Sequence, residues 1–348
     1  MFVYVHLSVI LNENEQNFHI KFVYVNYTFY FYGKFLKLRT TMKKVLVATD
    51  KPFAKVAVDG IRQIIEKAGY ELILLEKYTD HADFVKAVEQ VDAIIIRSDI
   101  ADREVIEAGK NLKIIVRAGA GYDNIDLLAA TERKVVAMNT PGQNSNAVAE
   151  LALGMMVYMA RNVFNGSSGT ELRGKSLGIH AYGNVGKYVA EIAKGFGMDL
   201  YAFDPYVTAS AMEKDGIKPV STVEELYSKC QYISLHIPAN AQTKKSIGFE
   251  LLSKMPKGAT LVNTARKEVI DEDGLLKVFE ARPDFKYLTD IEPDCKTDIA
   301  EKYAGRYFFT PKKMGAQTSE ANINAGLAAA SQIIDFLEKG ITTCQVNK

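Results

Sequence analysis

The sequence has almost no net charge and few cysteines, and each shortage excludes a class of protein. Lys and Arg total 43 against 42 Asp and Glu, which leaves a formal charge of +1. A general nucleic-acid binder shows a basic excess, so we expect none here, although a local basic pocket for a small anion stays compatible. Cys230, Cys295 and Cys344 lie far apart and form no CxxC or Cys/His spacing. We therefore expect no disulfide framework, no metal centre and a reducing, cytoplasmic location.

The sequence also lacks an apolar run long enough to cross a bilayer, which takes about 20 residues. The uncharged stretch 22–33 is shorter, and it has neither the basic region nor the cleavage site of a secretory signal. It belongs to residues 1–41, which hold 11 of the 35 aromatic residues and differ in composition from the rest. We predict that 1–41 is an extension outside the fold and that Met42 is the natural start.

From residue 44 onward, short apolar runs alternate with segments of helical spacing. The first runs are 45–48, 72–75, 93–96, 114–116 and 135–138, and a similar series follows Pro141. This alternation predicts an α/β fold with parallel sheets covered on both faces, and the length of 348 residues favours two domains. The segment 145–161 reads as one long helix that is apolar nearly all round, so we expect it to be buried between domains or subunits.

A glycine-rich turn at 177–186 predicts a dinucleotide site. It follows a predicted strand and opens a helix with the G-x-G-x-x-G spacing, Ala181 taking the first glycine position. Gly183 would let the backbone approach a pyrophosphate, and Gly186 would allow close helix–strand packing. The amides of Asn184 and Val185 at the helix start are candidates for binding phosphate.

The next predicted strand ends in Asp204, 18 residues beyond Gly186. A carboxylate at this place binds the ribose hydroxyls and rejects a 2′-phosphate, which favours NAD over NADP. The alternative is an ordinary βα turn followed by a solvated acid.

Together with this fingerprint, five further motifs make the chain resemble the D-isomer-specific 2-hydroxyacid dehydrogenases over residues 42–348. The motifs are Arg97-Ser98, RAGAGYDNID at 117–126, SLHIP at 234–238, VNTAR at 262–266 and GAQT at 315–318. The resemblance implies a flavodoxin-like substrate-binding domain made of 42–140 plus 318–348. It implies a Rossmann NAD-binding domain over 141–317.

The resemblance also implies which residues contact each ligand. The implied cofactor-binding residues are Ala181, Gly183, Asn184, Val185, Gly186, Asp204, His236, Ile237, Pro238, Thr264, Ala265, Asp290, Gly315 and Ala316. The implied substrate-binding residues are Arg97, Ser98, Ala118, Gly119 and Asn124. Ala118 and Gly119 are expected to offer backbone amides to a carboxylate. Arg97 directly follows an apolar strand, at the sheet edge where such folds bind ligands; its alternative role is an ordinary strand-end ion pair.

Hydride transfer from a 2-hydroxy carbon needs a cation for the substrate carboxylate and a base for the hydroxyl proton. Arg266 follows an apolar strand, and its guanidinium can bind a carboxylate through two hydrogen bonds. The resemblance places the catalytic arginine here, and the alternative is a surface arginine that caps a turn. Lys267 stands where most relatives have glycine.

The base departs from the family pattern. Relatives read Thr-Pro-His, whereas 310–316 reads TPKKMGA, so Lys313 occupies the place of the histidine. A lysine acts as a base only if desolvation or a nearby cation lowers its pKa from roughly 10.4. The histidine's usual acid partner matches Glu292, which stands two residues early. We predict that Lys313 works without a carboxylate beside it; alternatively Lys312 and Lys313 are solvated and the protein is slow or inactive.

The resemblance implies NAD-dependent oxidation of 3-phospho-D-glycerate to 3-phosphooxypyruvate, the first step toward L-serine, in a cytoplasmic homodimer that uses no metal. Because only eight residues follow Gly340 in this sequence, we expect no C-terminal regulatory domain. Two alternatives stay open. One is another D-2-hydroxyacid dehydrogenase, such as a glyoxylate or hydroxypyruvate reductase. The other is a non-enzymatic protein that senses NAD(H).

Overall fold

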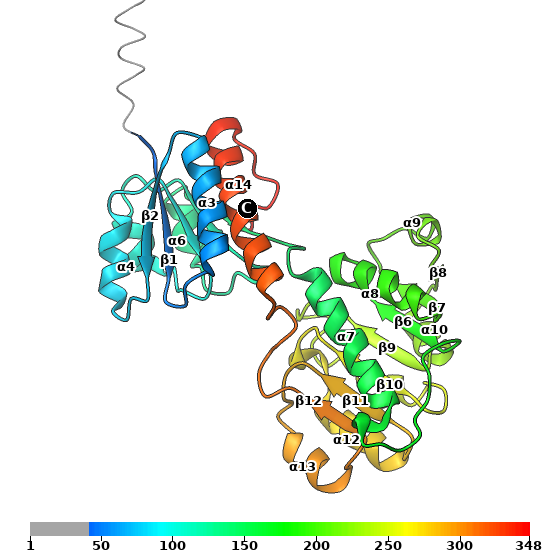
Figure 1. Cartoon of the computed structure of the whole chain (residues 1–348). Helices are drawn as coiled ribbons and strands as arrows, with labels where there is room; N and C mark the ends of the chain where they lie inside the picture. Colours follow the sequence, from blue (N-terminus) through cyan, green and yellow to red (C-terminus); the bar gives the residue numbers. More distant parts are fainter. Residues whose placement is uncertain (1–41) are drawn as a thin grey trace, which may run out of the picture.

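The computed structural model describes residues 42–348, so the prediction for residues 1–41 lies outside the described part of the chain. Two lobes are joined by the segments that lead into α7 (Ser145–Ala160) and α14 (Ser319–Lys339) (Figure 1). No helix of residues 42–348 is long and apolar enough to span a bilayer.

The first lobe contains a five-stranded, all-parallel sheet in the order β2-β1-β3-β4-β5. The strands are β1 (Lys44–Thr49), β2 (Glu71–Glu76), β3 (Ala93–Ile96), β4 (Ile114–Arg117) and β5 (Val136–Asn139). Helices α3 (Lys55–Lys67) and α14 pack against each other on one face. The other face is covered by α4 (His81–Val88), α5 (Arg103–Ala108) and α6 (Leu127–Glu132). Burial on both faces explains why these strands are continuous apolar runs.

The second lobe contains a seven-stranded, all-parallel sheet in the order β12-β11-β10-β9-β6-β7-β8. The strands are β6 (Ser176–His180), β7 (Asp199–Phe203), β8 (Lys218–Pro219), β9 (Tyr232–Leu235), β10 (Thr260–Asn263), β11 (Lys286–Thr289) and β12 (Tyr307–Phe309). Residues of α7 and α8 (Asn184–Gly195) form the core on one face. The opposite core includes residues of α10 (Val223–Lys229), α11 (Phe249–Leu252), α12 (Glu272–Ala281) and α13 (Lys296–Lys302). A short helix, α9 (Ala209–Lys214), precedes β8.

The expected fold class is confirmed: both lobes are doubly wound parallel sheets. The predicted helix 145–161 is α7, and ten of its 16 residues are buried. The assignment of the first lobe to substrate and of the second to NAD stays a prediction. Helix α14 nevertheless packs on α3, which joins the last segment of the chain to the first lobe.

The end of the chain covers the edge of the first sheet. Gln345 forms an antiparallel bridge with Met138 of the edge strand β5. The buried Asn347 side chain accepts from the Ala137 amide at 2.9 Å and donates to the Val135 carbonyl at 2.9 Å. These bonds satisfy backbone groups that an edge strand otherwise leaves exposed.

Candidate active site

The turn between β6 and α8 has the geometry of a phosphate-binding loop. Ala181 adopts a left-handed φ of 81°, as a glycine does at the first position of the fingerprint. Gly183 is the N-cap of α8, and a Cβ placed on it would meet nothing within 4 Å. A Cβ on Gly186 would lie 2.4 Å from the Ala181 carbonyl oxygen, so only glycine fits. Asn184 and Val185 form the first turn of α8, where backbone amides point outward.

Asp204 follows β7 and is fixed beside this turn. Its Oδ2 accepts from the Tyr182 amide at 2.8 Å, and its Oδ1 accepts from the Tyr206 amide at 2.8 Å. Both bonds orient the carboxylate without a cation, so its charge remains available to hydroxyl donors.

A cavity of about 1130 Å³ opens beside the turn. Among the predicted cofactor residues, it is lined by Ala181, Gly183, Asp204, His236, Ile237 and Pro238. Burial lowers the pKa of His236 to about 3 and that of His180, which also lines the cavity, to about 4. Both imidazoles are therefore neutral near pH 7. Nε2 of His236 has no hydrogen-bond partner within residues 42–348, although it is buried.

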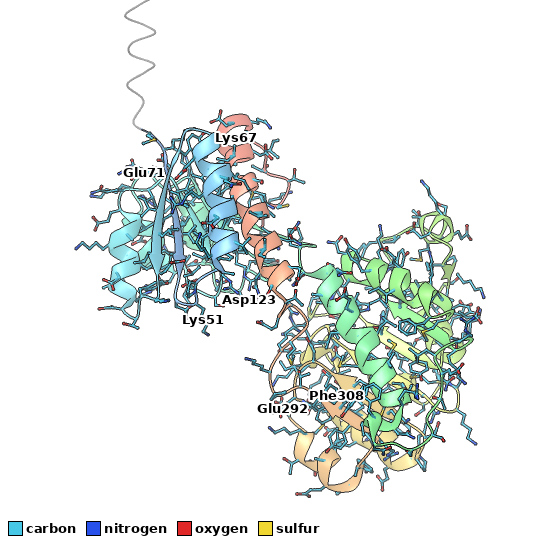
Figure 2. The ribbon with its side chains drawn as sticks, in the orientation of Figure 1. Lys51, Lys67, Glu71, Asp123, Glu292 and Phe308 are labelled. Atoms are coloured by element: carbon cyan, nitrogen blue, oxygen red, sulfur yellow. The ribbon has the colours of Figure 1, made fainter. Side chains whose placement is uncertain are left out.

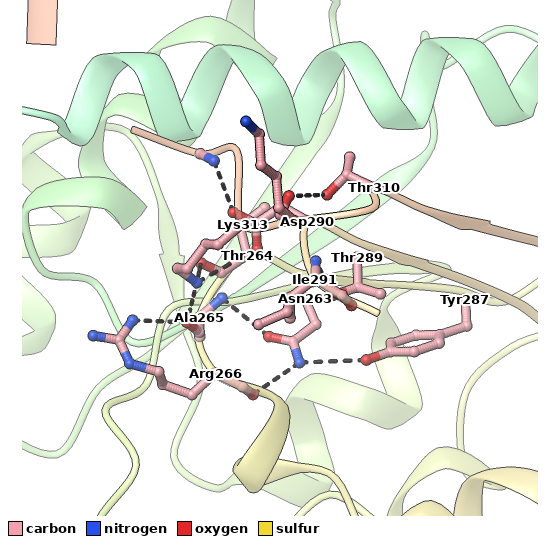
Figure 3. Close-up of polar contacts among 12 residues, drawn as sticks. Asn263, Thr264, Ala265, Arg266, Tyr287, Thr289, Asp290, Ile291, Thr310 and Lys313 are labelled. Carbon is pink, nitrogen blue, oxygen red and sulfur yellow. Dashed lines mark hydrogen bonds and ion pairs between the residues drawn. The ribbon is translucent and has the colours of Figure 1, made fainter. Parts of the chain in front are cut away.

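Two cations meet at the carboxyl end of β10 (Figure 3). Nζ of Lys313 donates to the Ala265 carbonyl oxygen at 2.7 Å and lies 3.4 Å from that of Thr264. Nη1 of Arg266 donates to the same Ala265 oxygen at 2.9 Å. The structure thus brings together Lys313, Arg266, Thr264 and Ala265, as the motifs led us to expect.

Asp290 follows β11 and is fully buried in this cluster. Its Oδ1 lies 3.5 Å from Nζ of Lys313, and its Oδ2 accepts from the Gly315 amide at 2.8 Å. A Cβ on Gly315 would lie 2.8 Å from Oδ2, so Gly315 permits this close approach. Ala316 follows directly, in the segment that leads to α14.

The expectation that Lys313 has no carboxylate beside it is wrong, because Asp290 is there. The pKa of Lys313 is nevertheless lowered from 10.5, chiefly by desolvation and further by the charge of Arg266, whereas Asp290 raises it. The Lys313 side chain keeps 40% of its surface exposed. Its amine contacts two carbonyl oxygens and one carboxylate oxygen.

Glu292 does not join this cluster. Its carboxylate forms an ion pair with Lys296 one turn further along the chain, so the structure does not bring it to Lys313. Lys267, the other departure from the family pattern, pairs with Asp294 at 2.6 Å. Glu292 and Asp294, the other two acids of the segment 290–295, are thus bound to other lysines.

In the first lobe, Arg97 follows β3 and donates only to neutral acceptors. Its Nη1 binds the carbonyl oxygens of Lys51 at 3.0 Å and Pro52 at 3.3 Å, and its Nη2 binds Oδ1 of Asn322 at 2.6 Å. The guanidinium also lies over the Phe53 ring. No ion pair joins Arg97 to a carboxylate within residues 42–348. This differs from the strand-end ion pair that was its alternative role.

Arg117, which ends β4, is a candidate that we did not single out from the sequence. Its Nε donates to the Arg97 carbonyl at 3.0 Å, and its guanidinium folds over Gly119, where a Cβ would lie 1.6 Å from Nη1. Burial lowers the Arg117 pKa, and the charges of Arg97 and Arg266 lower it further. Arg117 therefore lies near positive charges from both lobes, which Asp123 partly compensates. The sequence feature that could have identified Arg117 is its position at the start of the 117–126 motif, directly after a strand.

The backbone amides of Ala118 and Gly119 are not free for a carboxylate. Ala118 donates to the Ile96 carbonyl and Gly119 to that of Arg117, which corrects that expectation. Asn124 is also occupied, because its Nδ2 donates to the carbonyls of Arg97 and Asp99. Ser98 is exposed at the same edge. Figure 2 shows Lys51 and Asp123 on the side of the first lobe that faces the second, whereas Glu292 lies on the second lobe.

No group of three or more His, Cys, Asp or Glu side chains is placed to bind a metal in the part of the chain that is described.

Comparison with known proteins agrees with this geometry. The family model described as "D-isomer specific 2-hydroxyacid dehydrogenase, NAD binding domain" matches residues 158–298. A D-3-phosphoglycerate dehydrogenase of Synechocystis is 34% identical over 314 residues, 85% of this chain and 54% of that protein. A hydroxypyruvate reductase of Thermotoga maritima is 35% identical over 293 residues, 78% of this chain and 92% of that protein.

The crystal structure of NAD⁺-bound 3-phosphoglycerate dehydrogenase in Entamoeba histolytica is similar with a TM-score of 0.77 and 50% identity. The matched region covers 88% of this chain and 99% of that one. The chain spans about half the length of several of the D-3-phosphoglycerate dehydrogenases that it matches.

Proposed function

The chain belongs to the D-isomer-specific 2-hydroxyacid dehydrogenases, and from this we propose that it oxidises 3-phospho-D-glycerate to 3-phosphooxypyruvate with NAD. The product of this reaction leads to L-serine. The observation that carries the proposal is the meeting of Arg266 and Lys313 at the Ala265 carbonyl. Two further arginines without carboxylate partners lie across from them in the first lobe.

The residues at the β6–α8 turn fit a bound dinucleotide. Gly183 leaves room for a pyrophosphate, the first turn of α8 offers amides to it, and Asp204 is oriented to accept from ribose hydroxyls. His236 lines the same cavity. When bound, the nicotinamide supplies the hydride acceptor.

The protein's own residues would divide the remaining work. Arg266 holds the substrate carboxylate and stabilises negative charge that develops on the C2 oxygen. The neutral fraction of Lys313 takes the proton of the C2 hydroxyl as the hydride leaves C2. Asp290 orients the Lys313 amine and the Gly315 backbone, at the cost of opposing the loss of the proton from the ammonium.

The first lobe supplies binding groups for the other end of the substrate. Arg97 and Arg117 provide two positive charges for a phosphate, and neither forms an ion pair within the described lobe.

The amides of Ala120 and Gly121 replace those of Ala118 and Gly119 as our candidates for the carboxylate. They follow the occupied pair directly and have no acceptor among the backbone bonds of this loop.

A second candidate is the reduction of hydroxypyruvate or glyoxylate. It is favoured by the Thermotoga maritima relative, a hydroxypyruvate reductase of which this chain covers 92%. The two functions differ in the charge of the substrate tail, because only the phosphorylated substrate needs the cations of the first lobe. Arg97 is held in place by three acceptors whichever substrate binds.

The test compares oxidation of NADH in the presence of 3-phosphooxypyruvate and of hydroxypyruvate. We expect a higher kcat/KM for the phosphorylated substrate and a loss of at least tenfold in Arg97→Ala that is confined to it. An equal loss for both substrates would favour the reductase. Binding of NADH without turnover of either substrate would leave a nucleotide-sensing protein.

We also propose that the enzyme is a cytoplasmic homodimer. Along α7, Leu151, Val157 and Tyr158 are only half-buried, and Phe164 just beyond the helix is 65% exposed. A second copy would cover this surface. The three cysteines are free thiols, which suits a reducing compartment. Sedimentation velocity tests the dimer, and we expect Phe164→Asp to sediment as a monomer.

A further inference from the structure

We propose that Asp99 is a positioning residue that fixes Arg97 and the loops after β1, β2 and β3 at the edge of the first sheet. In this way it sets the affinity for the phosphorylated end of the substrate. The inference rests on the proposed function, since it assigns Asp99 to the same site. The residue touches no substrate itself.

The Asp99 carboxylate accepts hydrogen bonds from residues that follow three neighbouring strands. Asp99 is only 5% exposed. Oδ1 accepts from the Asp50 amide at 2.7 Å and from the Tyr78 hydroxyl at 2.7 Å, and Oδ2 accepts from the Arg97 amide at 3.2 Å. Asp50 follows β1, Tyr78 follows β2 and Arg97 follows β3, so one buried side chain ties three loops together. Hydrogen bonds to an ionised acceptor are the stronger kind.

Asp99 therefore fixes the Arg97 backbone together with groups on its other side. The Arg97 carbonyl accepts from Nε of Arg117 at 3.0 Å and from Nδ2 of Asn124 at 3.2 Å. The guanidinium of Arg97 binds the carbonyls of Lys51 and Pro52, in the loop whose Asp50 amide Asp99 also holds. Both the arginine and two of its acceptors thus depend on the same carboxylate.

The charge of Asp99 acts on Arg97 without occupying its guanidinium. Burial lowers the pKa of Arg97, and the nearby Asp99 and Asp50 oppose this shift. Yet the Asp99 oxygens bind an amide, a hydroxyl and a second amide rather than the guanidinium. A direct salt bridge would compete with a substrate phosphate for the same N–H donors. Asp99 thus compensates part of the positive charge of Arg97 and leaves the guanidinium donors free of a carboxylate.

The test is Asp99→Asn, which keeps the shape but removes the charge and turns one acceptor into a donor. With 3-phosphooxypyruvate we expect KM to rise at least tenfold, while kcat changes less than threefold. The KM for hydroxypyruvate and the Kd for NADH should stay as in the wild type. The matched control is Asp80→Asn, which removes an exposed carboxylate of the same lobe that caps α4, and its KM should not change.

Tyr78→Phe is the second variant, because it removes one donor to Asp99 and keeps the charge. If Asp99→Asn does not fold, a rise of threefold or more in the KM of Tyr78→Phe supports the inference, and an unchanged KM overturns it. A folded Asp99→Asn enzyme with wild-type KM, or with kcat lost equally for both substrates, also overturns it. Turnover of 3-phosphooxypyruvate by the wild type tests the proposed function separately, and its absence would overturn both.

Discussion

Lys313 and Arg266 donate to the same carbonyl oxygen, that of Ala265, at 2.7 and 2.9 Å. Two positive charges so close favour the loss of one proton, and only the lysine can lose one because a guanidinium stays protonated. The shared acceptor therefore separates the roles of the two residues: Arg266 remains the permanent cation, and Lys313 becomes the titrating group.

The first prediction concerns Lys313. Because the pKa of Lys313 lies below the ordinary 10.5, kcat/KM for oxidation should rise with pH as the amine becomes neutral. The rise should reach its plateau at a pH below 10.5. Lys313→Arg should lose about 10²- to 10⁴-fold in kcat, since arginine does not deprotonate. Lys313→His should shift the rise toward about 6.5. NADH binding, followed by fluorescence, should be unchanged in both variants; unaltered turnover in Lys313→Arg would contradict the role of base.

The second prediction concerns Ala181. Its left-handed φ of 81° is strained for a residue with a Cβ, and glycine adopts it without that cost. We expect Ala181→Gly to raise the free energy of unfolding by about 1 kcal/mol in urea titrations. Ala190→Gly in the middle of α8 is the matched control and should lower it. A loss of stability in Ala181→Gly would show that the turn is not strained.

The third prediction separates two glycines of the same turn. Gly186→Ala places a Cβ 2.4 Å from the Ala181 carbonyl oxygen, and we expect a loss of about 1–3 kcal/mol in stability. Gly183→Ala meets nothing within 4 Å, so its stability should stay close to the wild type. Its Kd for NADH should nevertheless rise at least tenfold, because the new methyl group lies where the pyrophosphate approaches. Wild-type NADH affinity in Gly183→Ala would place the cofactor elsewhere.

The fourth prediction concerns acid stability. His236 and His180 have pKa values lowered from 6.5 to about 3 and about 4, so both are neutral in the folded state while the unfolded chain binds protons below about pH 6.5. Above pH 6.5 the two neutral rings therefore make their full contribution to the free energy of unfolding. This contribution is lost as the pH falls toward the pKa values of the rings in the folded state. Between pH 7 and pH 5, His236 alone should account for about 2 kcal/mol. In urea titrations over this interval, the free energy of unfolding of His236→Gln should fall by about 2 kcal/mol less than that of the wild type. An identical pH dependence would contradict the burial of a neutral ring.

Local patterns in the sequence determined the fold class and the nucleotide turn. Continuous apolar strands and helical spacing indicated parallel sheets, because burial on both faces leaves no polar positions in a strand. The spacing of Ala181, Gly183 and Gly186 predicted the turn, since a tight bend and a close helix approach constrain those positions directly. Lys313 in place of a histidine was equally plain in the sequence, as was the position of Arg266.

Only the tertiary structure decided what surrounds these residues. It placed Asp290 beside Lys313, because the loops after β11 and β12 end side by side, and it turned Glu292 toward Lys296 one helical turn away instead. It also showed that the amides of Ala118 and Gly119 donate to carbonyl groups at the edge of the sheet. It also revealed Arg117 and Asp99, whose partners include loop residues 20 and 49 positions away. The sequence by itself determines which groups are present, whereas packing decides which of them remain free to act.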